Sequence, residues 1–343
     1  MEFGKKLFKF FNTGISYFLP VIIAGGMLFS FTLITGHVEN GQIVASNQFF
    51  QNLYDLGQAG FAMMVPVICG YIAYAIASKP ALAPGLILGY AANNPIGAKQ
   101  ISTGFIGAII LGFLVGYFVK WMKKWKIPSQ FQALMPTFFI PVVTTTVIGI
   151  VYVYALVYPL NGFVQIMVNA LNGLSGANVA ILGIAIGILA ALDMGGPCSK
   201  AATAFTLALM AEGIYGPNGA FRLCCAVPPL GLALASLLLR DRYDKADRQL
   251  GITALCLSLG GITEGAIPFA GKDFKRVIPG ICLGTAVAGM LGMLHGVESL
   301  VAFGGIVAIG GVTVGKLWYV VDMLIGAFII VAFMFLTKPK LEE

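Results

Sequence analysis

The sequence predicts an all-α polytopic membrane protein with about ten transmembrane helices and two re-entrant hairpins. Hydrophobic residues make up 58% of the chain, charged residues only 10%, and the mean hydropathy is +0.90. Soluble domains carry about 25% charged residues. Apolar runs of roughly 20 residues, enough to cross about 30 Å of hydrocarbon as a helix, recur along the whole chain. No cleavable signal peptide is evident at the start, so we expect the first apolar segment to be retained as a span.

The basic residues set the expected orientation, because Lys and Arg collect in the cytoplasmic loops of membrane proteins. The loop over residues 37–55 contains two acids and no Lys or Arg, so we expect it to face outward. The five basic clusters are Lys5, Lys6 and Lys9; Lys120, Lys123, Lys124 and Lys126; Arg240, Arg242, Lys245 and Arg248; Lys272, Lys275 and Arg276; and Lys338 and Lys340. The predicted crossings are 13–36, 56–78, 80–98, 102–122, 136–158, 178–194, 200–216, 222–239, 277–296 and 317–336. Both termini then lie in the cytoplasm.

Two apolar stretches do not fit as crossings, because the charge pattern puts both ends of each on one side. Residues 250–270 lie between two basic clusters, and residues 299–315 are rich in glycine. We expect each to form a re-entrant hairpin, which survives at membrane depth only where protein or a watery cavity shields it. Broken segments of this kind are typical of the substrate sites of transporters. The alternative is that one of them is a full crossing.

The chain is expected to divide into two membrane halves, residues 1–158 and 178–343. Between them, residues 159–177 carry no charge and have apolar residues at helical spacing. This pattern predicts an amphipathic helix at the membrane interface. An ordinary extracellular linker is the alternative.

Several function classes are disfavoured by what the sequence contains. The six cysteines form no CxxC pair and only two histidines exist, so we expect no metal or other cofactor. The net charge of +7 is explained by membrane orientation and does not indicate nucleic-acid binding. The chain contains no Walker-type phosphate loop. Energy from a phosphoryl group or a nucleotide must therefore be brought by another polypeptide.

One acid stands out in the run "GGITEGAIPFAGKDFKR", residues 260–276. An ionised acid at a membrane centre costs about 2.5–3.5 kcal/mol, so Glu264 is expected to face protein or water. It lies between Thr263 and Gly265 in a glycine-rich stretch that allows close approach of the backbone. A carboxylate there can bind sugar hydroxyls and take a proton from one of them. The alternative is a helix cap or an ion pair with Lys272 or Lys275.

A second constellation is "LDMGGPCSKAATAF", residues 192–205. Gly195, Gly196 and Pro197 are expected to break the helix that carries Asp193. Ser199 is then expected to cap a new helix opened by Lys200. A helix N-terminus beside a lysine suits an anion or a set of hydroxyl groups. Alternatively, Asp193 pairs with Lys200.

These two motifs resemble those of a known family. "DMGGPCSKAATAF" is similar to the DMGGP-x-x-KAA-x-AF signature of the fructose-type enzyme IIC of the bacterial phosphoenolpyruvate-dependent sugar phosphotransferase system. "ITEGAIPFAGKDFKRVIP" resembles the same family's S/T-EGAIPFA-x-x-D-x-x-RVIP segment. Stretches of the first half, such as "MMVPVICGYIAYAIASKPALAPG", also match in order.

The resemblance implies a homodimeric sugar permease of the bacterial plasma membrane. Its first half supports the dimer, and its second half carries the sugar across by an elevator-type movement. A separate phosphorylated IIB protein, supplied through IIA, then phosphorylates the sugar. By position in the motifs, the resemblance assigns catalysis to Glu264 and substrate binding to the following set: Asp193, Gly195, Gly196, Pro197, Ser199, Lys200, Thr263, Glu264, Gly265 and Phe303.

The chain departs from the family pattern at four positions, one of which is Ala302, where many members have Pro. Ser199 and Thr203 stand where many members have Asn and Tyr, and Phe303 stands where many have His. These changes leave fructose, a related ketose or a polyol as the expected substrate. The alternative function is an ion-coupled secondary transporter that works without IIB, with Glu264 or Asp193 as proton carrier. An intramembrane enzyme is disfavoured, because no nucleophile–base pair or metal constellation is present.

Overall fold

The computed structural model describes residues 2–35, 37–39, 42–94, 101–125, 128, 131–172 and 177–341. Lys126 of the second basic cluster and residues 173–176 of the expected linker lie outside these ranges. By its internal packing the chain divides into two units. The first contains residues 1–25 and 58–173, and the second contains residues 26–57 and 174–343. Each unit is described by itself.

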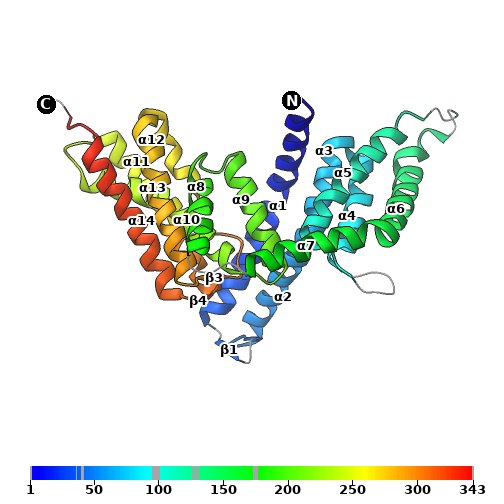
Figure 1. The fold of residues 1–343 in the computed structure, drawn as a ribbon, viewed down its shortest axis with the longest axis horizontal. Coiled ribbons are helices and arrows are strands. Elements are labelled where there is room, and N and C mark those ends of the chain that lie inside the picture. The colour runs from blue at the N-terminus through cyan, green and yellow to red at the C-terminus, as the bar shows by residue number, and fades with distance from the viewer. Residues whose placement is uncertain are drawn as a thin grey trace. The chain divides into compact units, whose positions relative to one another are not determined.

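The helices of the first unit follow the expected apolar runs (Figure 1). Its elements are the first part of α1 (Glu2–Thr35), the end of α2 (Gln48–Ala62), α3 (Met64–Ala77), α4 (Lys79–Asn93), α5 (Gly104–Met122), the π-helical turn η2 (Met135–Phe139), α6 (Ile140–Val151), a second π-helical turn η3 (Tyr152–Leu156) and α7 (Val157–Asn172). Small residues let α3, α4 and α5 pack closely, as in other membrane helix bundles. A Cβ on Gly85 would lie 2.8 Å from the Cα of Gly70, so α3 and α4 touch backbone to backbone.

The second unit is built around α10, which packs against α8, α11, α13 and α14. Its elements are the end of α1, β1 (His37–Glu39), β2 (Gln42–Val44), the start of α2, α8 (Ala177–Ala191), α9 (Pro197–Ala211), α10 (Gly216–Leu238), α11 (Lys245–Leu259), the 3-10 turn η4 (Thr263–Ala266), α12 (Ile267–Lys272), α13 (Phe274–Leu294), β3 (Glu298–Ser299), the 3-10 turn η5 (Ile306–Gly311), β4 (Val312–Val314) and α14 (Lys316–Thr337). Here too glycine sets the spacing, since a Cβ on Gly187 of α8 would lie 2.6 Å from the carbonyl carbon of Thr285 in α13.

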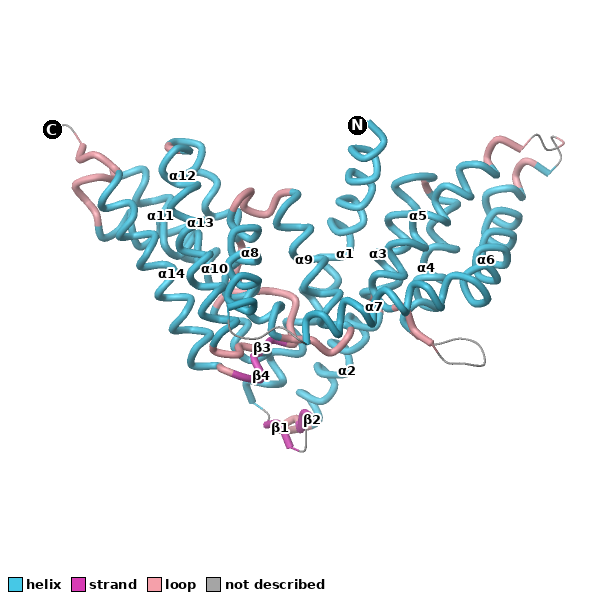
Figure 2. The backbone as a smooth tube through the Cα atoms, in the orientation of Figure 1, coloured by secondary structure: helices cyan, strands magenta, loops and turns pink. Residues whose placement is uncertain are grey.

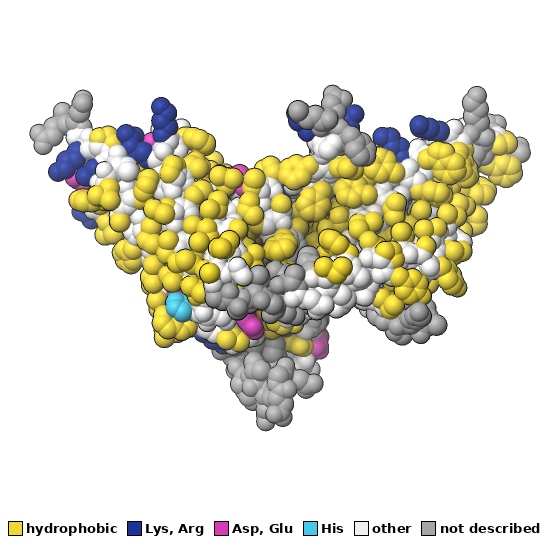
Figure 3. Space-filling model, viewed as in Figure 1, with side chains coloured by type: hydrophobic (Ala, Val, Ile, Leu, Met, Phe, Trp, Pro, Cys, Tyr) yellow, Lys and Arg dark blue, Asp and Glu magenta, His cyan; other side chains and the backbone are white. Residues whose placement is uncertain are grey.

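The predicted class, an all-α polytopic membrane protein, is confirmed (Figure 2). In the described part of the chain, seven helical segments are long and apolar enough to cross a membrane: 4–28, 48–77, 104–122, 135–166, 216–238, 274–294 and 316–337. Figure 3 shows that the visible sides of the helices are largely apolar, and that Lys and Arg gather at helix ends.

Three of the ten expected crossings are shorter than predicted. The segments expected at 80–98, 178–194 and 200–216 fold as α4, α8 and α9, each 15 residues long. At 1.5 Å per residue such a helix spans about 22 Å. In the sequence, glycine or proline follows each of these helices within four residues, and both are poor helix formers. The count of ten crossings therefore stays a prediction, and so do the expected domain boundaries.

The two stretches expected as hairpins meet at their glycines. Gly261 has a φ of +65°, and a Cβ on it would lie 2.5 Å from the Cα of Gly304. Gly305 has a φ of +77°, and a Cβ on it would lie 2.5 Å from the Gly261 nitrogen. The second stretch is further held by Tyr319, whose hydroxyl donates to the Gly305 carbonyl at 3.0 Å. Only glycine allows both the positive φ and the contact.

We expect Gly261→Ala to lower the melting temperature of the purified protein much more than Gly296→Ala. Both glycines have a φ of +65°, but a Cβ on Gly296 meets nothing within 4 Å. Both substitutions therefore carry the same backbone cost. The difference between their melting temperatures measures the steric overlap of the new methyl group at position 261, and such overpacking typically costs about 1–3 kcal/mol. Equal melting temperatures for the two variants would show that the hairpin contact does not hold.

Candidate functional site

The two sequence motifs come together at one point of the second unit. A Cβ on Gly195 would lie 2.5 Å from Oε1 of Glu264 and 2.8 Å from its carboxyl carbon. The Glu264 carboxylate therefore lies directly against the backbone of the helix break between α8 and α9. Gly195 has a φ of +96°, which disfavours other residues there independently of space. No residue with a side chain fits this position without moving the carboxylate.

The helix break itself is organised by Asp193. Its carboxylate accepts hydrogen bonds from the backbone N–H of Ser199, at 3.0 Å, and from that of Cys198. A Cβ on Gly196 would lie 2.8 Å from the Asp193 carboxyl carbon, so this glycine makes room for the side chain. Pro197 occupies the first position of α9, where its missing N–H costs nothing. Asp193 thus satisfies two of the free N–H groups at the start of α9.

The expected capping role of Ser199 is wrong. The helix begins at Pro197 rather than at Lys200, and its cap residue Gly196 has no side chain. Ser199 lies buried in the first turn. Asp and Ser are both good helix-capping residues. Here Asp193 is the residue that caps α9, because its side chain reaches across the turn to the first N–H groups of the helix. The preceding Met194 has a φ of +47°, which is uncommon for a residue other than glycine and marks this turn as constrained.

The Glu264 side chain is exposed. The Thr263 hydroxyl donates a long hydrogen bond of 3.4 Å to its Oε2. The alternative of an ion pair with Lys272 is not supported, because the Lys272 ammonium lies 2.6 Å from Asp247 instead. Among the described residues, Glu264 therefore keeps an accessible carboxylate with lone pairs available for a ligand.

The neighbouring residues hold Glu264 in place. Gly265 packs closely between α10 and α11, since a Cβ on it would lie 3.1 Å from Pro229 and 3.3 Å from Leu257. Thr263 is buried in the same 3-10 turn, η4. This turn lies against α10 and α11, which are well-packed helices of the unit. The backbone that carries Glu264 is therefore fixed on both sides.

Phe303 lies in the second stretch expected as a hairpin. It is buried, and a Cβ on Gly26 of α1 would lie 3.1 Å from its ring. The aromatic ring thus packs on the backbone of α1. Its neighbours Gly304 and Gly305 make the contact with Gly261. The structure brings Asp193, Gly195, Gly196, Pro197 and Ser199 together with Thr263, Glu264 and Gly265, and places Lys200, half-buried, in the first turn of α9.

Arg222, which neither of the two sequence motifs includes, is buried inside α10. Its Nε donates to Oδ1 of Asn218 at 3.0 Å, and Asn218 donates in turn to the carbonyls of Ser299 and Val301 at 2.8 Å each. Nη2 of Arg222 is buried without a partner among the described residues. The rule that ionisable residues inside apolar helices carry function could have identified it.

Chemically, the site offers a firmly placed, accessible carboxylate beside a helix N-terminus. A carboxylate so placed can accept hydrogen bonds from hydroxyl groups and can act as a general base. In the described ranges, no group of three His, Cys, Asp or Glu residues is placed to hold a metal ion.

Comparisons with known proteins point in the same direction. A family model described as "Phosphotransferase system, EIIC" matches residues 12–270. The chain is 33% identical to "Fructose-like permease IIC component 2" of Escherichia coli, over 92% of this chain and 86% of that protein. It is also 33% identical to "PTS system fructose-specific EIIC component" of Haloferax volcanii, over 96% and 92%. A "PTS system fructose-specific EIIABC component" of Bacillus subtilis matches 99% of this chain at 33% identity, but only 53% of its own length is covered.

We expect Asp193→Ala to destabilise the protein by about 1 kcal/mol, because two N–H groups of α9 lose their acceptor. Asp193→Asn keeps one of the two acceptor oxygens and places an NH2 group at the other, so its melting temperature is expected to lie between those of the unaltered protein and the Ala variant. Thermal melting in detergent measures both. Asp241→Ala serves as control, since Asp241 makes an exposed pair with Lys340. An Asn variant that melts as low as the Ala variant would contradict the cap.

Proposed function

The chain belongs to the EIIC family of the phosphotransferase system, and we propose that it is the sugar permease of such a system, for fructose or a related ketose or polyol. In this proposal, inward transport is coupled to phosphorylation of the sugar by a separate phosphorylated IIB protein. The single observation that carries the proposal is the accessible Glu264 carboxylate lying against Gly195, where the two family motifs meet.

Glu264 is proposed to bind a sugar hydroxyl and to accept its proton. The hydroxyl oxygen attacks the phosphorus of a phosphocysteine on IIB, and the phosphorus–sulfur bond breaks as the phosphorus–oxygen bond forms. The hydroxyl proton passes to the Glu264 carboxylate. The contact with Gly195 holds the Glu264 carboxylate within reach of the sugar hydroxyl. General-base catalysis requires this geometry before any other property of the base.

Asp193, Gly195, Gly196, Pro197, Ser199, Lys200, Thr263, Gly265 and Phe303 are proposed as the remaining substrate-binding set. The capped start of α9 and the turn η4 supply its backbone, which supports a pocket of fixed shape. Phe303 is proposed to act by closing one side with an apolar surface in place of a hydrogen-bonding group.

The proposed partners are IIB and IIA. Relatives whose names combine EIIC with EIIA or EIIB support them, because in those proteins the parts are joined in one chain. The proposed location is the bacterial inner membrane, with both termini in the cytoplasm and a homodimeric assembly. No cofactor is proposed, since IIB supplies the phosphoryl group.

We further propose an elevator-type movement in which the second unit carries the sugar. Two re-entrant hairpins, at 250–270 and 299–315, would enclose the substrate. The contact of Gly261 with Gly304 and Gly305 supports this, because hairpins locked backbone to backbone move together rather than one by one. The buried link from Arg222 through Asn218 to the second stretch ties it to α10 in the same way.

Glu264→Gln is expected to lower sugar phosphorylation by about 10²–10⁴-fold, because a general base is lost while shape is kept. The assay uses membranes that contain the protein, purified phosphorylated IIB and candidate sugars. Glu298→Gln is the matched control and should leave the rate unchanged. Full activity of the Glu264 variant would refute the assigned role. Sugar uptake driven by a pH gradient in vesicles without IIB would instead favour an ion-coupled transporter.

Gly195→Ala is expected to reduce phosphorylation nearly as much as Glu264→Gln, because the added methyl group displaces the carboxylate. Gly213→Ala is the control, since Gly213 has a similar φ of +82° but open space around it. Both substitutions carry a backbone cost of about 1–2 kcal/mol. If the two variants melt at similar temperatures but only Gly195→Ala loses phosphorylation, the loss comes from the contact with Glu264 and not from lower stability. If both variants keep the same rate, the contact with Glu264 has no part in the reaction.

A further inference from the structure

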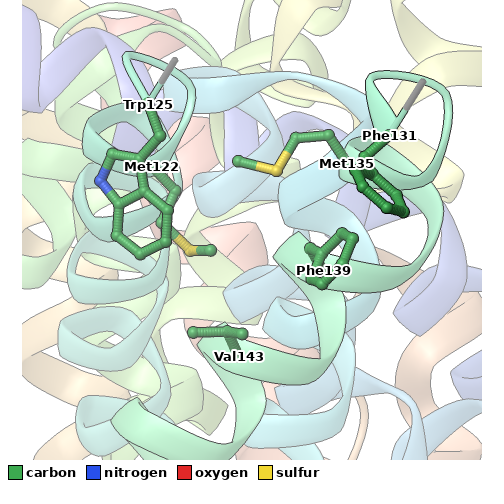
Figure 4. Close-up of a pocket in the computed structure, with 6 residues that line it drawn as sticks. All are labelled: Met122, Trp125, Phe131, Met135, Phe139 and Val143. Atoms are coloured by element: carbon green, nitrogen blue, oxygen red, sulfur yellow. The ribbon is translucent and has the colours of Figure 1, made fainter. Parts of the chain in front are cut away.

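The first unit contains an apolar cavity of about 270 Å³ (Figure 4). Met122 and Trp125, from the end of α5 and just beyond it, lie on one side of the cavity. Residues of the following segment, which include the π-helical turn η2, lie on the other side. The lining consists of Met122, Trp125, Phe131, Met135, Phe139 and Val143. The proposed transport cycle uses none of these side chains.

The chemistry of the lining restricts what can fill this cavity. The six lining side chains are mainly hydrocarbon, and the indole N–H of Trp125 is their one hydrogen-bond donor, so they offer few hydrogen bonds to an occupant. A peptide segment or a sugar would lose the hydrogen bonds of its polar groups on entry, which is costly. The volume lies below the roughly 300–1,000 Å³ of typical small-molecule sites. A hydrocarbon chain satisfies both conditions, because it is slender and has no polar group.

Basic residues lie next to the lining residues in the sequence. Lys120, in the last turn of α5, and Lys124, just beyond its end, are exposed and lie two positions before and after Met122. Lys123 donates to the carbonyl of Ala77, so it is already engaged. The sequence has no Asp or Glu between Asp55 and Asp193. No acid of this long region can neutralise the two lysines, and an anionic group is therefore the complementary partner.

Two tryptophans indicate the depth of the site in the membrane. Trp121 is exposed, and its ring meets that of Trp125 edge-on with centroids 5.0 Å apart. Tryptophan is enriched where headgroups meet acyl chains. The apolar cavity, the two tryptophans and the two exposed lysines thus lie in one short part of the chain, at and beyond the end of α5, as expected of a site where a phospholipid changes from acyl chain to headgroup.

We propose that this cavity is a specific site for an anionic phospholipid. One acyl chain fills the space between Met122, Trp125 and Met135, and the phosphate headgroup contacts Lys120 and Lys124. Bound there, the lipid connects the end of α5 to the start of α6. The proposal is independent of the sugar site, since all its residues belong to the first unit.

The test measures lipid binding to the purified full chain by native mass spectrometry in detergent. Phosphatidylglycerol and phosphatidylcholine with identical acyl chains are the probes. We expect phosphatidylglycerol to bind more tightly. We expect the K120Q/K124Q double variant to lose this preference, at about fivefold per lysine. The K5Q/K6Q double variant removes the same charge from exposed positions of the same unit and should keep the preference.

A second pair of variants tests the cavity. Met135→Trp fills it and is expected to abolish the tight binding of phosphatidylglycerol, while Leu134→Trp, at an exposed neighbouring position outside the lining, leaves it unchanged. Equal binding of the two lipids to the unaltered protein would overturn the proposal. So would a preference that survives Met135→Trp. A Met135→Cys variant that forms a disulfide-linked dimer in lipid vesicles would assign the cavity to a second copy of the chain and also overturn it.

Discussion

The site rests on one close contact, between the carboxylate of Glu264 and the bare backbone of Gly195. In a chain this apolar, an acid is tolerated only where its surroundings are arranged for it. Here the arrangement is made by glycine: Gly195 takes a positive φ and gives up its side-chain volume to the carboxylate. Glycine also allows a close backbone contact where Gly261 meets Gly304 and Gly305. Backbone contacts of this kind allow little adjustment, so they fix the position of Glu264 closely.

Two further interactions extend this constraint outward. Asp193 holds the start of α9 and so fixes the turn that contains Gly195. Lys272 and Arg276, the basic residues that follow Glu264, are paired with Asp247 and Asp273. The charges near the motif are therefore mostly used within the fold, and Glu264 is left accessible. Glu264 and the basic residues that follow it in the sequence therefore have separate roles.

Much of this could be predicted from sequence. Composition and apolar runs predicted the all-α membrane class, and the two motifs with their glycines singled out Asp193 and Glu264. The contact between Gly195 and Glu264 could not be predicted, because it joins segments far apart in the chain. Helix length was overestimated for α4, α8 and α9, since hydropathy does not record where Gly and Pro end a helix. Ser199 was preferred to Asp193 as a cap because the sequence does not show how far a side chain reaches across a turn. The sequence shows Arg222 as a lone charge in an apolar run, but its link through Asn218 to the segment after α13 depends on the fold.

The most direct measurement is an experimental density map of the protein in a lipid nanodisc with fructose or another transported sugar bound. The account predicts a sugar hydroxyl within about 2.6–3.2 Å of the Glu264 carboxylate, next to Gly195. A sugar bound elsewhere in the second unit, with Glu264 turned toward lipid or open solvent, would contradict it.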